Sequence, residues 1–277
     1  MSHSGLSSQL IDLDAAPPLI PADYRAPATI HSISPAIVLD CLRAGWSDYR
    51  QARTYGLLFS AFYVVWGILL VSSLFALNVA FLVFPVIAGF LLVGPIVVVG
   101  LYDVSRRIET GEALALKPVL FSFTRHGATQ LLLFGALLVF IMVVWLKAAA
   151  LLYALTFGLS PIPAGEILVR ASTDTRVLTF LLAGNAIGAG LGALVFCISV
   201  AGIPYLLDKD VDFITAATTS IRAVMQNKGP MVVWAIILAA MLLGSVATGF
   251  LGLLVALPVA GHTTWHLYRR MVEDQAQ

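Results

Sequence analysis

Charged side chains are scarce in this sequence. Only 11% of the 277 residues are Asp, Glu, Lys or Arg, whereas 60% are hydrophobic, and the mean hydropathy is positive. A soluble globule of this length needs more charge to cover its surface, so the composition is typical of an integral membrane protein. The net charge of +1 gives no indication of an acidic substrate or of nucleic acid as a partner.

Cysteine is also scarce, and the sequence motifs of several enzyme classes are missing. The two cysteines, Cys41 and Cys197, match neither a CxxC metal site nor a disulfide framework. We interpret them as a buried small apolar residue and a free interfacial thiol. The chain has no GxSxG elbow, Walker A loop, dinucleotide fingerprint or HExxH zinc helix. We therefore predict no catalytic residues.

The N-terminal segment lacks the features of a signal peptide. The first fifty residues contain no apolar core of suitable length, and Asp12, Asp14 and Asp23 disrupt the basic region with which such a peptide begins. Prolines stand among small polar residues at positions 17, 18, 21 and 27. We expect residues 1–33 to form a disordered cytoplasmic tail that is retained.

Long apolar runs are abundant. A helix needs about 20 apolar residues to cross the hydrocarbon core of a bilayer. Six stretches are long enough: Tyr55 to Ala76, Asn78 to Leu101, Gln130 to about Leu152, Val177 to Leu206, Met231 to about Ala247, and about Gly249 to Leu267. The breaks after the first and fifth stretches are so short that each predicts a tight hairpin turn.

The basic residues predict the orientation of these helices. Thirteen of the sixteen Lys and Arg residues lie before the first stretch, between the second and third, between the fourth and fifth, or after the sixth. Only Arg170 and Arg176 lie in loops on the opposite side. Because cytoplasmic loops carry an excess of Lys and Arg, we predict that both termini are cytoplasmic.

A threefold repeat organises the chain. An amphipathic segment precedes each odd-numbered stretch, in SPAIVLDCLRAGWSDYR, KPVLFSFTRHG and DKDVDFITAATTSIRAVMQNKGP. A Gly, an aromatic residue and charges end each even-numbered stretch, in GPIVVVGLYDVSRR, SVAGIPYLLDKD and LPVAGHTTWHLYRR. The pattern predicts an all-α polytopic membrane protein with six transmembrane helices as three hairpins, each preceded by a cytoplasmic interfacial amphipathic helix.

The repeat also sets the expected domain organisation. We expect a single membrane domain over residues 34–272 and a C-terminal tail over residues 273–277. The hairpin units are expected at about 34–102, 113–206 and 211–268. Since each unit crosses twice, the copies are parallel, and the inverted repeats of many secondary transporters are not evident.

Two histidines near the C-terminus, His262 and His266, lie about 40° apart on one helical face. Their rings could converge on a zinc or copper ion. Candidates for the further ligands are Asp208, Asp210, Asp212 and His126. Haem would need a second helix to supply its other axial ligand. The alternative is that both histidines bond neighbouring helix ends, while Trp265 and Tyr268 anchor at the lipid headgroups.

Polar residues within the predicted spans are few. Lys147 lies in the third stretch, where its side chain could extend outward to water or pair with Glu166 or Asp174. Asn185, in the fourth stretch, is expected to form an interhelical hydrogen bond. The same stretch carries small residues at four-residue spacing, Gly184, Gly188 and Gly192. They predict close helix packing, either inside the protein or at a dimer face.

Charged residues at the ends of the even-numbered stretches predict a polar cytoplasmic rim. It comprises Asp103, Arg106, Arg107, Asp208, Asp210, Arg269 and the two histidines. If the repeat holds, these groups meet in one ring, where Arg-carboxylate pairs would lock the hairpins together. The ring could also serve as a docking surface.

Four blocks of the sequence resemble a known family. They are GWSDYR at 45–50, GLYDVSRR at 100–107, LVFCISVAGIPYLLDKDVDFITAATTSIRAVMQNKGPMVVWA at 194–235, and LPVAGHTTWHLYR at 257–269. Over roughly residues 36–272 the chain is similar to the bacterial predicted integral membrane proteins called domain of unknown function 2189. The resemblance implies a multi-pass protein of the bacterial inner membrane with no established activity. Some relatives carry a cytochrome c oxidase subunit label.

Three functional hypotheses follow from these features. The first is a non-enzymatic structural or accessory component of a membrane complex, such as a respiratory oxidase, without a cofactor. Its partners would be the lipid bilayer and other subunits or a second copy. The second is a small-solute transporter or channel that uses Lys147 and Asn185. The third is a metal or haem protein that uses His262 and His266.

Overall fold

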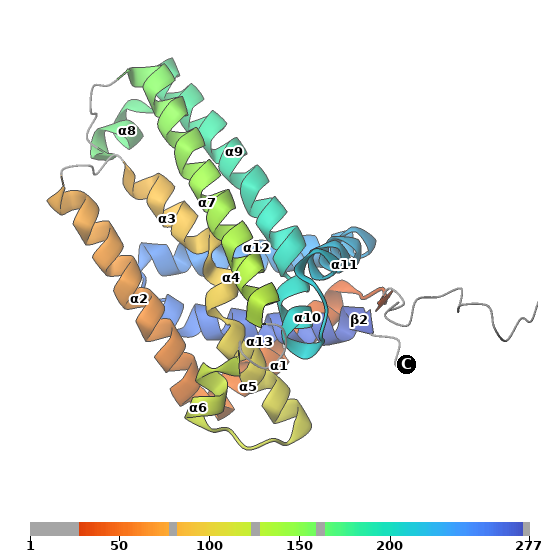
Figure 1. Cartoon of the computed structure of the whole chain (residues 1–277). Coiled ribbons are helices and arrows are strands. Elements are labelled where there is room, and N and C mark those ends of the chain that lie inside the picture. The colour runs from red at the N-terminus through yellow and green to blue at the C-terminus, as the bar shows by residue number, and fades with distance from the viewer. Residues whose placement is uncertain (1–27, 78–81, 123–127, 159–163, 274–277) are drawn as a thin grey trace, which may run out of the picture.

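The computed structural model describes residues 28–77, 82–122, 128–158 and 164–273, which are almost entirely helical. Figure 1 shows an arm of long helices joined to a body, and the helices of the body run at a steep angle to those of the arm. The predicted tails lie largely outside the described residues. Residues 28–33, at the end of the predicted N-terminal tail, have a defined structure that includes strand β1 (Thr29–Ile30).

The chain continues into α1 (Pro35–Gln51) and α2 (Arg53–Ala76). Proline at the first position starts α1, because its fixed φ suits a helix and its missing N–H would have no partner there. The predicted amphipathic periodicity is present in part: one face of α1, including Val38, Cys41 and Tyr49, is buried. Trp46, which the sequence pattern places on the same apolar stripe, is instead 44% exposed. The buried face packs against the last helix of the protein.

The second predicted span is divided into shorter helices. These are α3 (Val83–Leu92), α4 (Gly94–Val97) and α5 (Val99–Thr110), followed by α6 (Leu116–Leu120). Pro95, at the start of α4, cannot donate the backbone hydrogen bond that would continue α3. The series runs back from the far end of α2 toward its beginning (Figure 1).

The arm is built on two long helices, α7 (Ala128–Phe157) and α9 (Thr175–Ser199), which lie side by side with α3 against α7 (Figure 1). The short helix α8 (Ala164–Arg170) lies at the tip of the arm. Asp174 caps α9 by accepting a hydrogen bond from Arg176 N at 2.9 Å. α10 (Gly202–Asp208) extends α9 toward the body.

The body contains α11 (Phe213–Gln226), α12 (Lys228–Ala247) and α13 (Leu253–Met271). Asp212 caps α11, because its carboxylate accepts from Ile214 N and Thr215 N, both at 2.9 Å. α12 and α13 are joined by a tight turn and run across the ends of the arm helices (Figure 1).

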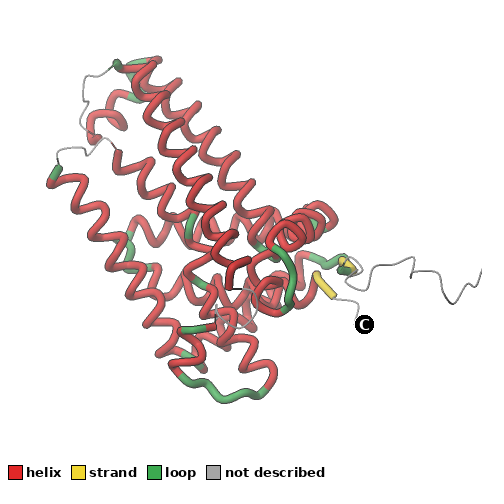
Figure 2. The backbone as a smooth tube through the Cα atoms, viewed as in Figure 1, coloured by secondary structure: helices red, strands yellow, loops and turns green. Residues whose placement is uncertain are grey.

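The two ends of the described chain meet in a small antiparallel sheet (Figure 2). Strand β2 (Val272–Glu273) pairs with β1, so that Thr29 lies opposite Glu273. Asn227, at the junction of α11 and α12, binds the residues that follow β1. Its side chain accepts a hydrogen bond from Ile33 N at 2.7 Å and donates one to His31 O at 3.0 Å.

Four helices among the described residues are long and apolar enough to cross a membrane: α2, α7, the continuous stretch from Thr175 to Asp208, and α12. This agrees with an all-α membrane protein. The predicted second span is broken, with α3 as its longest apolar piece, and α13, in the place of the predicted sixth span, is not among the four. The six-span, three-hairpin arrangement is therefore not confirmed.

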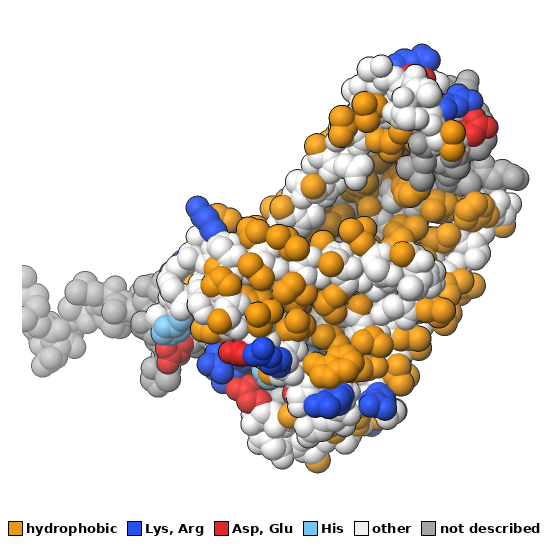
Figure 3. All heavy atoms as spheres, turned by 180° about the vertical axis from the view of Figure 1, so that it is seen from behind, with side chains coloured by type: hydrophobic (Ala, Val, Ile, Leu, Met, Phe, Trp, Pro, Cys, Tyr) orange, Lys and Arg blue, Asp and Glu red, His pale blue; other side chains and the backbone are white. Residues whose placement is uncertain are grey.

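The side chains of α13 are more buried than those of these four helices. Trp265, Leu267, Tyr268 and Met271 are at most 1% exposed, so α13 forms the centre of the core. The other helices expose large apolar side chains, such as Phe140 at 63% on α7. Charged side chains gather at the arm tip and at the opposite end of the molecule, with hydrophobic side chains between them (Figure 3). This distribution fits a bilayer environment.

Candidate functional site

The candidate site surrounds the C-terminal half of α13, which packs against α1, α5 and α10. Glycines allow the close approach. A Cβ atom added at Gly45 of α1 would lie 2.6 Å from Thr263 N, and one at Gly261 would lie 3.3 Å from Leu101 of α5. Since α13 touches its neighbours so closely, its polar side chains must find partners within the protein.

The two histidines of α13 are linked to a carboxylate of α1, His266 directly and His262 through Ser105. His266 Nε2 lies 2.8 Å from Asp48 Oδ2, and Ser105 Oγ donates to the same oxygen at 2.7 Å. His262 Nδ1 lies 2.7 Å from Ser105 Oγ. We call these four residues the Asp48 cluster. It joins α1, α5 and α13.

The hydrogen bonds of the Asp48 cluster define its donors. The ionised carboxylate only accepts, so His266 Nε2 carries a hydrogen and donates to Asp48. Ser105 has one hydroxyl hydrogen, which it donates to Asp48. His262 Nδ1 must therefore carry a hydrogen and donate to Ser105 Oγ. Every bond in this chain runs toward the carboxylate, which stabilises its negative charge.

The Asp48 cluster contains the residue types of a hydrolase triad but not its arrangement. In a triad the histidine accepts the serine proton, whereas here Ser105 donates to the carboxylate itself. Ser105 and His262 are 0% exposed. A cavity of about 280 Å³ lies elsewhere and is lined by His31, Lys209, Tyr268, Arg269, Val272 and Glu273. The geometry therefore favours a structural role for the cluster.

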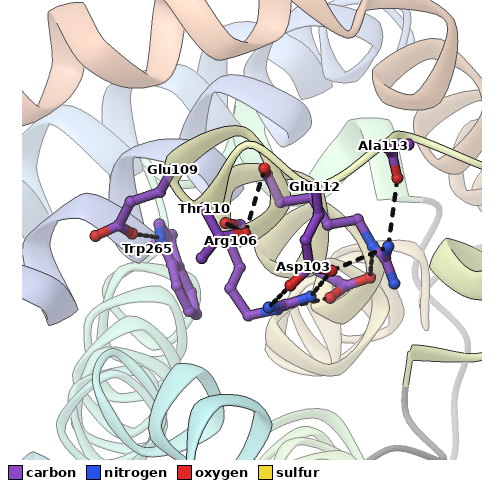
Figure 4. Close-up of polar contacts among 8 residues, drawn as sticks. Asp103, Arg106, Glu109, Thr110, Glu112, Ala113 and Trp265 are labelled. Atoms are coloured by element: carbon purple, nitrogen blue, oxygen red, sulfur yellow. Dashed lines mark hydrogen bonds and ion pairs between the residues drawn. The ribbon is translucent and has the colours of Figure 1, made fainter.

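A second group links the end of α13 to α5 and α10. Glu109 accepts from Trp265 Nε1 and from Arg269 Nε, both at 3.0 Å, as Figure 4 shows for Trp265. Tyr268 Oη donates to Asp208 at 2.8 Å, and an Arg269 nitrogen lies 3.7 Å from the same carboxylate. We call these five residues the rim cluster.

Arg269 is the charged centre of the rim cluster. Burial disfavours its charged form, but the hydrogen bond to Glu109 and the charges of Glu109 and Asp208 outweigh burial and raise the pKa of Arg269 above its ordinary value. The guanidinium therefore stays charged and bridges carboxylates from two different helices.

Arg106 and Arg107 belong to a separate, local group. Asp103, which is 0% exposed, accepts from Arg106 Nε at 3.0 Å and from Arg107 Nε at 2.7 Å. The Arg106 guanidinium also donates twice to Glu112, at 2.7 and 2.9 Å (Figure 4). The hydrogen bond to Glu112 is the largest of the effects that raise the pKa of Arg106. These contacts fasten the end of α5 to the following turn.

The structure thus divides the predicted polar ring. Arg269 and Asp208 pair across helices, as the ring predicts. His262 and His266 instead join Asp48 and Ser105, while Asp103, Arg106 and Arg107 pair near one another in sequence. The exposed Asp210 follows α10.

The proposed further metal ligands do not gather around the histidine pair. Among the described residues, no three His, Cys, Asp or Glu side chains are placed to hold a metal ion. Asp208 bonds Tyr268, and Asp212 caps α11. His126 lies outside the described residues. A metal or haem bound through His262 and His266 stays a prediction. Asp48, which contacts His266, is the nearest additional residue that could act as a metal ligand.

The predicted anchoring of Trp265 and Tyr268 at the lipid headgroups is wrong. The two side chains are 0% and 1% exposed and lie inside the protein, where they bond Glu109 and Asp208. An aromatic residue at a helix end suits either a headgroup or a buried polar partner. Here the packing of α1, α5 and α10 around α13 covers both rings.

The two predicted intramembrane polar residues lie on the outside of the arm. Lys147 is exposed on α7. Its suggested partners are engaged, since Glu166 pairs with Arg170 and Asp174 caps α9. Asn185 is also exposed, and its amide donates to Leu181 O in its own helix at 2.8 Å rather than to another helix.

The glycines of α9 differ in their surroundings. A Cβ atom at Gly188 would lie 3.1 Å from Trp145 of α7, and one at Gly184 would lie 3.6 Å from Leu152. These two positions therefore face α7, as internal packing requires. A Cβ atom at Gly192 would meet nothing within 4 Å.

Asp48, Ser105 and Glu109 are site residues that the sequence patterns did not predict. Asp48 had a detectable signal, because it lies on the same helical face as Cys41 and Gly45, which the periodicity places toward the core. An acid on such a face needs a buried partner. Ser105 and Glu109 carry no comparable signal.

No curated protein matches the chain, and no solved structure does. A family model matches from the start of α3 to the end of α10, which includes Asp103, Ser105 and Asp208 but neither α1 nor α13. Over residues 83–208 the resemblance found in the sequence is confirmed, because this segment matches the family described as "Predicted integral membrane protein (DUF2189)". The blocks at 45–50 and 257–269 lie outside the match.

Proposed function

We propose that the protein is a non-enzymatic structural or accessory component of a membrane complex. The observation that carries this proposal is the enclosure of its reactive side chains. Ser105 and His262 are fully buried and hydrogen-bonded to each other. Catalysis requires such groups to reach a substrate in an accessible cavity. Here they connect helices.

The placement we propose is the bacterial inner membrane, with both termini cytoplasmic. The excess of Lys and Arg at one end supports the orientation. The pairing of β1 with β2 supports a common side for the two ends, because Thr29 and Glu273 lie opposite each other. The six-span, three-hairpin arrangement is part of this proposal. Its support is the packing of α2 on α3, α7 on α9 and α12 on α13.

The partners we propose are the lipid bilayer and either other subunits or a second copy of the chain. A respiratory oxidase is one candidate complex, and this candidate comes from the label carried by some relatives. Exposed apolar residues such as Trp66 at 54% and Ile236 at 63% provide surfaces that lipid or another subunit can cover.

Affinity purification at native expression in a mild detergent tests the proposal. A tag should follow residue 277, so that β1 and β2 keep their pairing. We expect a defined set of membrane subunits, or a second copy, to be recovered with the protein. A variant with Asp48 replaced by Asn should recover less of that set if the arrangement of helix ends matters. Recovery of this chain alone, as a monomer, would contradict the proposal.

A small-solute transporter or channel is the alternative function. It is motivated by Lys147, an exposed cation on an otherwise apolar helix. Replacement of Lys147 and Asn185 by Leu should then change the flux of a solute whose uptake depends on the protein. Unchanged flux of every such solute would remove this assignment.

A further inference from the structure

The outward face of α1 carries alternating apolar and cationic side chains. Leu39, Arg43, Trp46 and Arg50 recur at spacings of three and four residues, which places them along one side of the helix. All four are exposed, Trp46 at 44% and Leu39 at 45%. The opposite face packs against α13. This outward face is therefore the surface that α1 presents to its surroundings.

The cationic face continues across the junction of α1 and α2. Arg53 is the first residue of α2 and is exposed. Val119 of α6 is fully buried in a cluster with Ala52 of the junction and Val104 of α5. Two residues before it, Lys117 is exposed. Figure 1 shows α6 beside the beginning of α2, so the elements that carry Arg50, Arg53 and Lys117 meet at one junction.

These three cations have no counter-ion in the part of the protein that the structure describes. Within the described residues, Arg50, Arg53 and Lys117 form no ion pair. The nearby acids are already engaged: Asp48 binds His266 and Ser105, and Glu112 binds Arg106. None of the described acids therefore neutralises these cations, which leaves them to bind another anion.

The junction lies at one boundary of the apolar surface. Directly after Arg53, α2 exposes Leu57, Leu58 and Phe62, and it continues as one of the four helices able to cross a membrane. Exposed apolar residues also occur on α6, at Leu116 and Leu120. Lys and Arg side chains lie directly beside hydrophobic ones at this end of the molecule (Figure 3). The phosphates of a bilayer lie just outside its hydrocarbon core, so a helix that enters the core after Arg53 would bring this junction to their level.

We propose that Arg50, Arg53 and Lys117 form a binding site for the headgroup of an anionic phospholipid, with Trp46 at the lipid interface. Guanidinium groups bind phosphate through paired hydrogen bonds, and the ammonium adds a further charge. Trp favours the headgroup level because its ring is apolar while its N–H bonds water. The acyl chains would lie against Leu57 and Leu58. A zwitterionic lipid offers the same phosphate but no net negative charge.

Native mass spectrometry of the full chain in detergent tests this site. The protein is titrated with phosphatidylglycerol or with phosphatidylcholine, and the bound fraction is measured. We expect tighter binding of phosphatidylglycerol. Arg50→Gln with Arg53→Gln should weaken it roughly fivefold for each arginine removed, and Lys117→Gln should weaken it further. Raised salt should reduce the difference between the two lipids.

Two exposed arginines at the other end of the protein provide a matched control. Arg170→Gln with Arg176→Gln removes the same charge and should leave phosphatidylglycerol binding unchanged. An equal loss in this control, or no loss in the Arg50 and Arg53 variant, would overturn the site. Inorganic phosphate at constant ionic strength should not displace the lipid, because it lacks acyl chains. Displacement of the lipid by phosphate would also overturn the proposal. So would a co-purified protein that stays bound in place of lipid and is lost in the Arg50 and Arg53 variant.

Discussion

His266 of α13 and Asp48 of α1 lie 218 residues apart in sequence, yet His266 Nε2 is 2.8 Å from the Asp48 carboxylate. With Ser105, this contact fastens the first described helix to the last and to α5. Asp48 is 6% exposed, so water cannot replace a lost partner easily. The stability of the helix ends should therefore depend on this carboxylate.

Replacement of Asp48 by Asn should destabilise the protein. The amide removes the charge that both donors stabilise, and a hydrogen bond to a buried charged group contributes about 2 kcal/mol. Thermal unfolding in detergent, followed by circular dichroism, measures the effect. Asp40→Asn is the control, because its carboxylate is exposed and pairs with the exposed Arg43. Equal unfolding temperatures for the two variants would contradict the role of Asp48.

Gly45→Ala should also destabilise the protein, by about 1 to 3 kcal/mol. Its Cβ would lie 2.6 Å from Thr263 N and 2.9 Å from Thr263 Cα, so the backbones of α1 and α13 would have to separate. Gly190→Ala of α9 is the matched control, since nothing lies within 4 Å of its added Cβ. If both variants unfold at the wild-type temperature, α1 and α13 do not pack as described.

The thiol of Cys41 should react slowly with maleimide. Burial raises the pKa of Cys41 to about 11, although the charge of Arg270 acts in the opposite direction. Since the thiolate is the reactive form, its fraction at pH 8 should be roughly a hundredfold below that of a thiol with the ordinary value. In a Cys197→Ser background Cys41 is the single thiol, so labelling before and after denaturation measures its protection. Fast labelling of the folded protein would show that the face of α1 that carries Cys41 is accessible to the reagent.

Asp212→Ala removes the N-cap of α11 and should lower the free energy of unfolding by about 1 kcal/mol. Asp212→Ser keeps a side-chain oxygen that can cap the helix, so it should retain most of the stability. The hydrogen bond from Thr215 is the largest effect that lowers the pKa of Asp212 below 3.8. The folded state therefore prefers the charged carboxylate, and its contribution is present at neutral pH. That contribution is lost as the pH falls through the lowered value. The difference between Asp212→Ala and wild type should shrink over that range; a constant difference would contradict the assigned cap.

Removal of transition metals should leave the fold intact. His262 and His266 already have protein partners in Ser105 and Asp48. We expect the unfolding temperature to be the same before and after dialysis against a chelator, with no metal in stoichiometric amount and no haem absorption. A stoichiometric metal whose removal lowers the unfolding temperature would instead support the metal hypothesis.

Local patterns in the sequence predicted much of the helical framework. The apolar runs of α2, α7, α9 and α12 are long enough to be recognised individually, because crossing a bilayer sets a minimum length. The sequence NKGP, at Asn227 to Pro230, predicts the end of the amphipathic segment, and the junction of α11 and α12 lies there. The amphipathic pattern of α1 also predicted that Val38 and Cys41 are buried, but it placed the exposed Trp46 on the same stripe.

Contacts between distant segments were not predictable in the same way. Asp48 and His266 meet only after α1 has packed on α13, and no local pattern records that packing. Trp265 illustrates the same limit: its position suited the headgroups, but α5 supplies Glu109 and the core covers the ring. The repeat likewise could not show that Arg106 pairs with the nearby Glu112 rather than across the ring.

The pairing of β1 with β2 also constrains the order in which the protein is made. Thr29 leaves the ribosome long before Glu273, its partner in the sheet. Asn227, which binds His31 and Ile33, is also synthesised late. Residues 28–33 cannot reach their final position until α13 has been completed. The N-terminal segment therefore stays without these partners while the intervening helices are made, and it docks only after α13 and β2 have been synthesised.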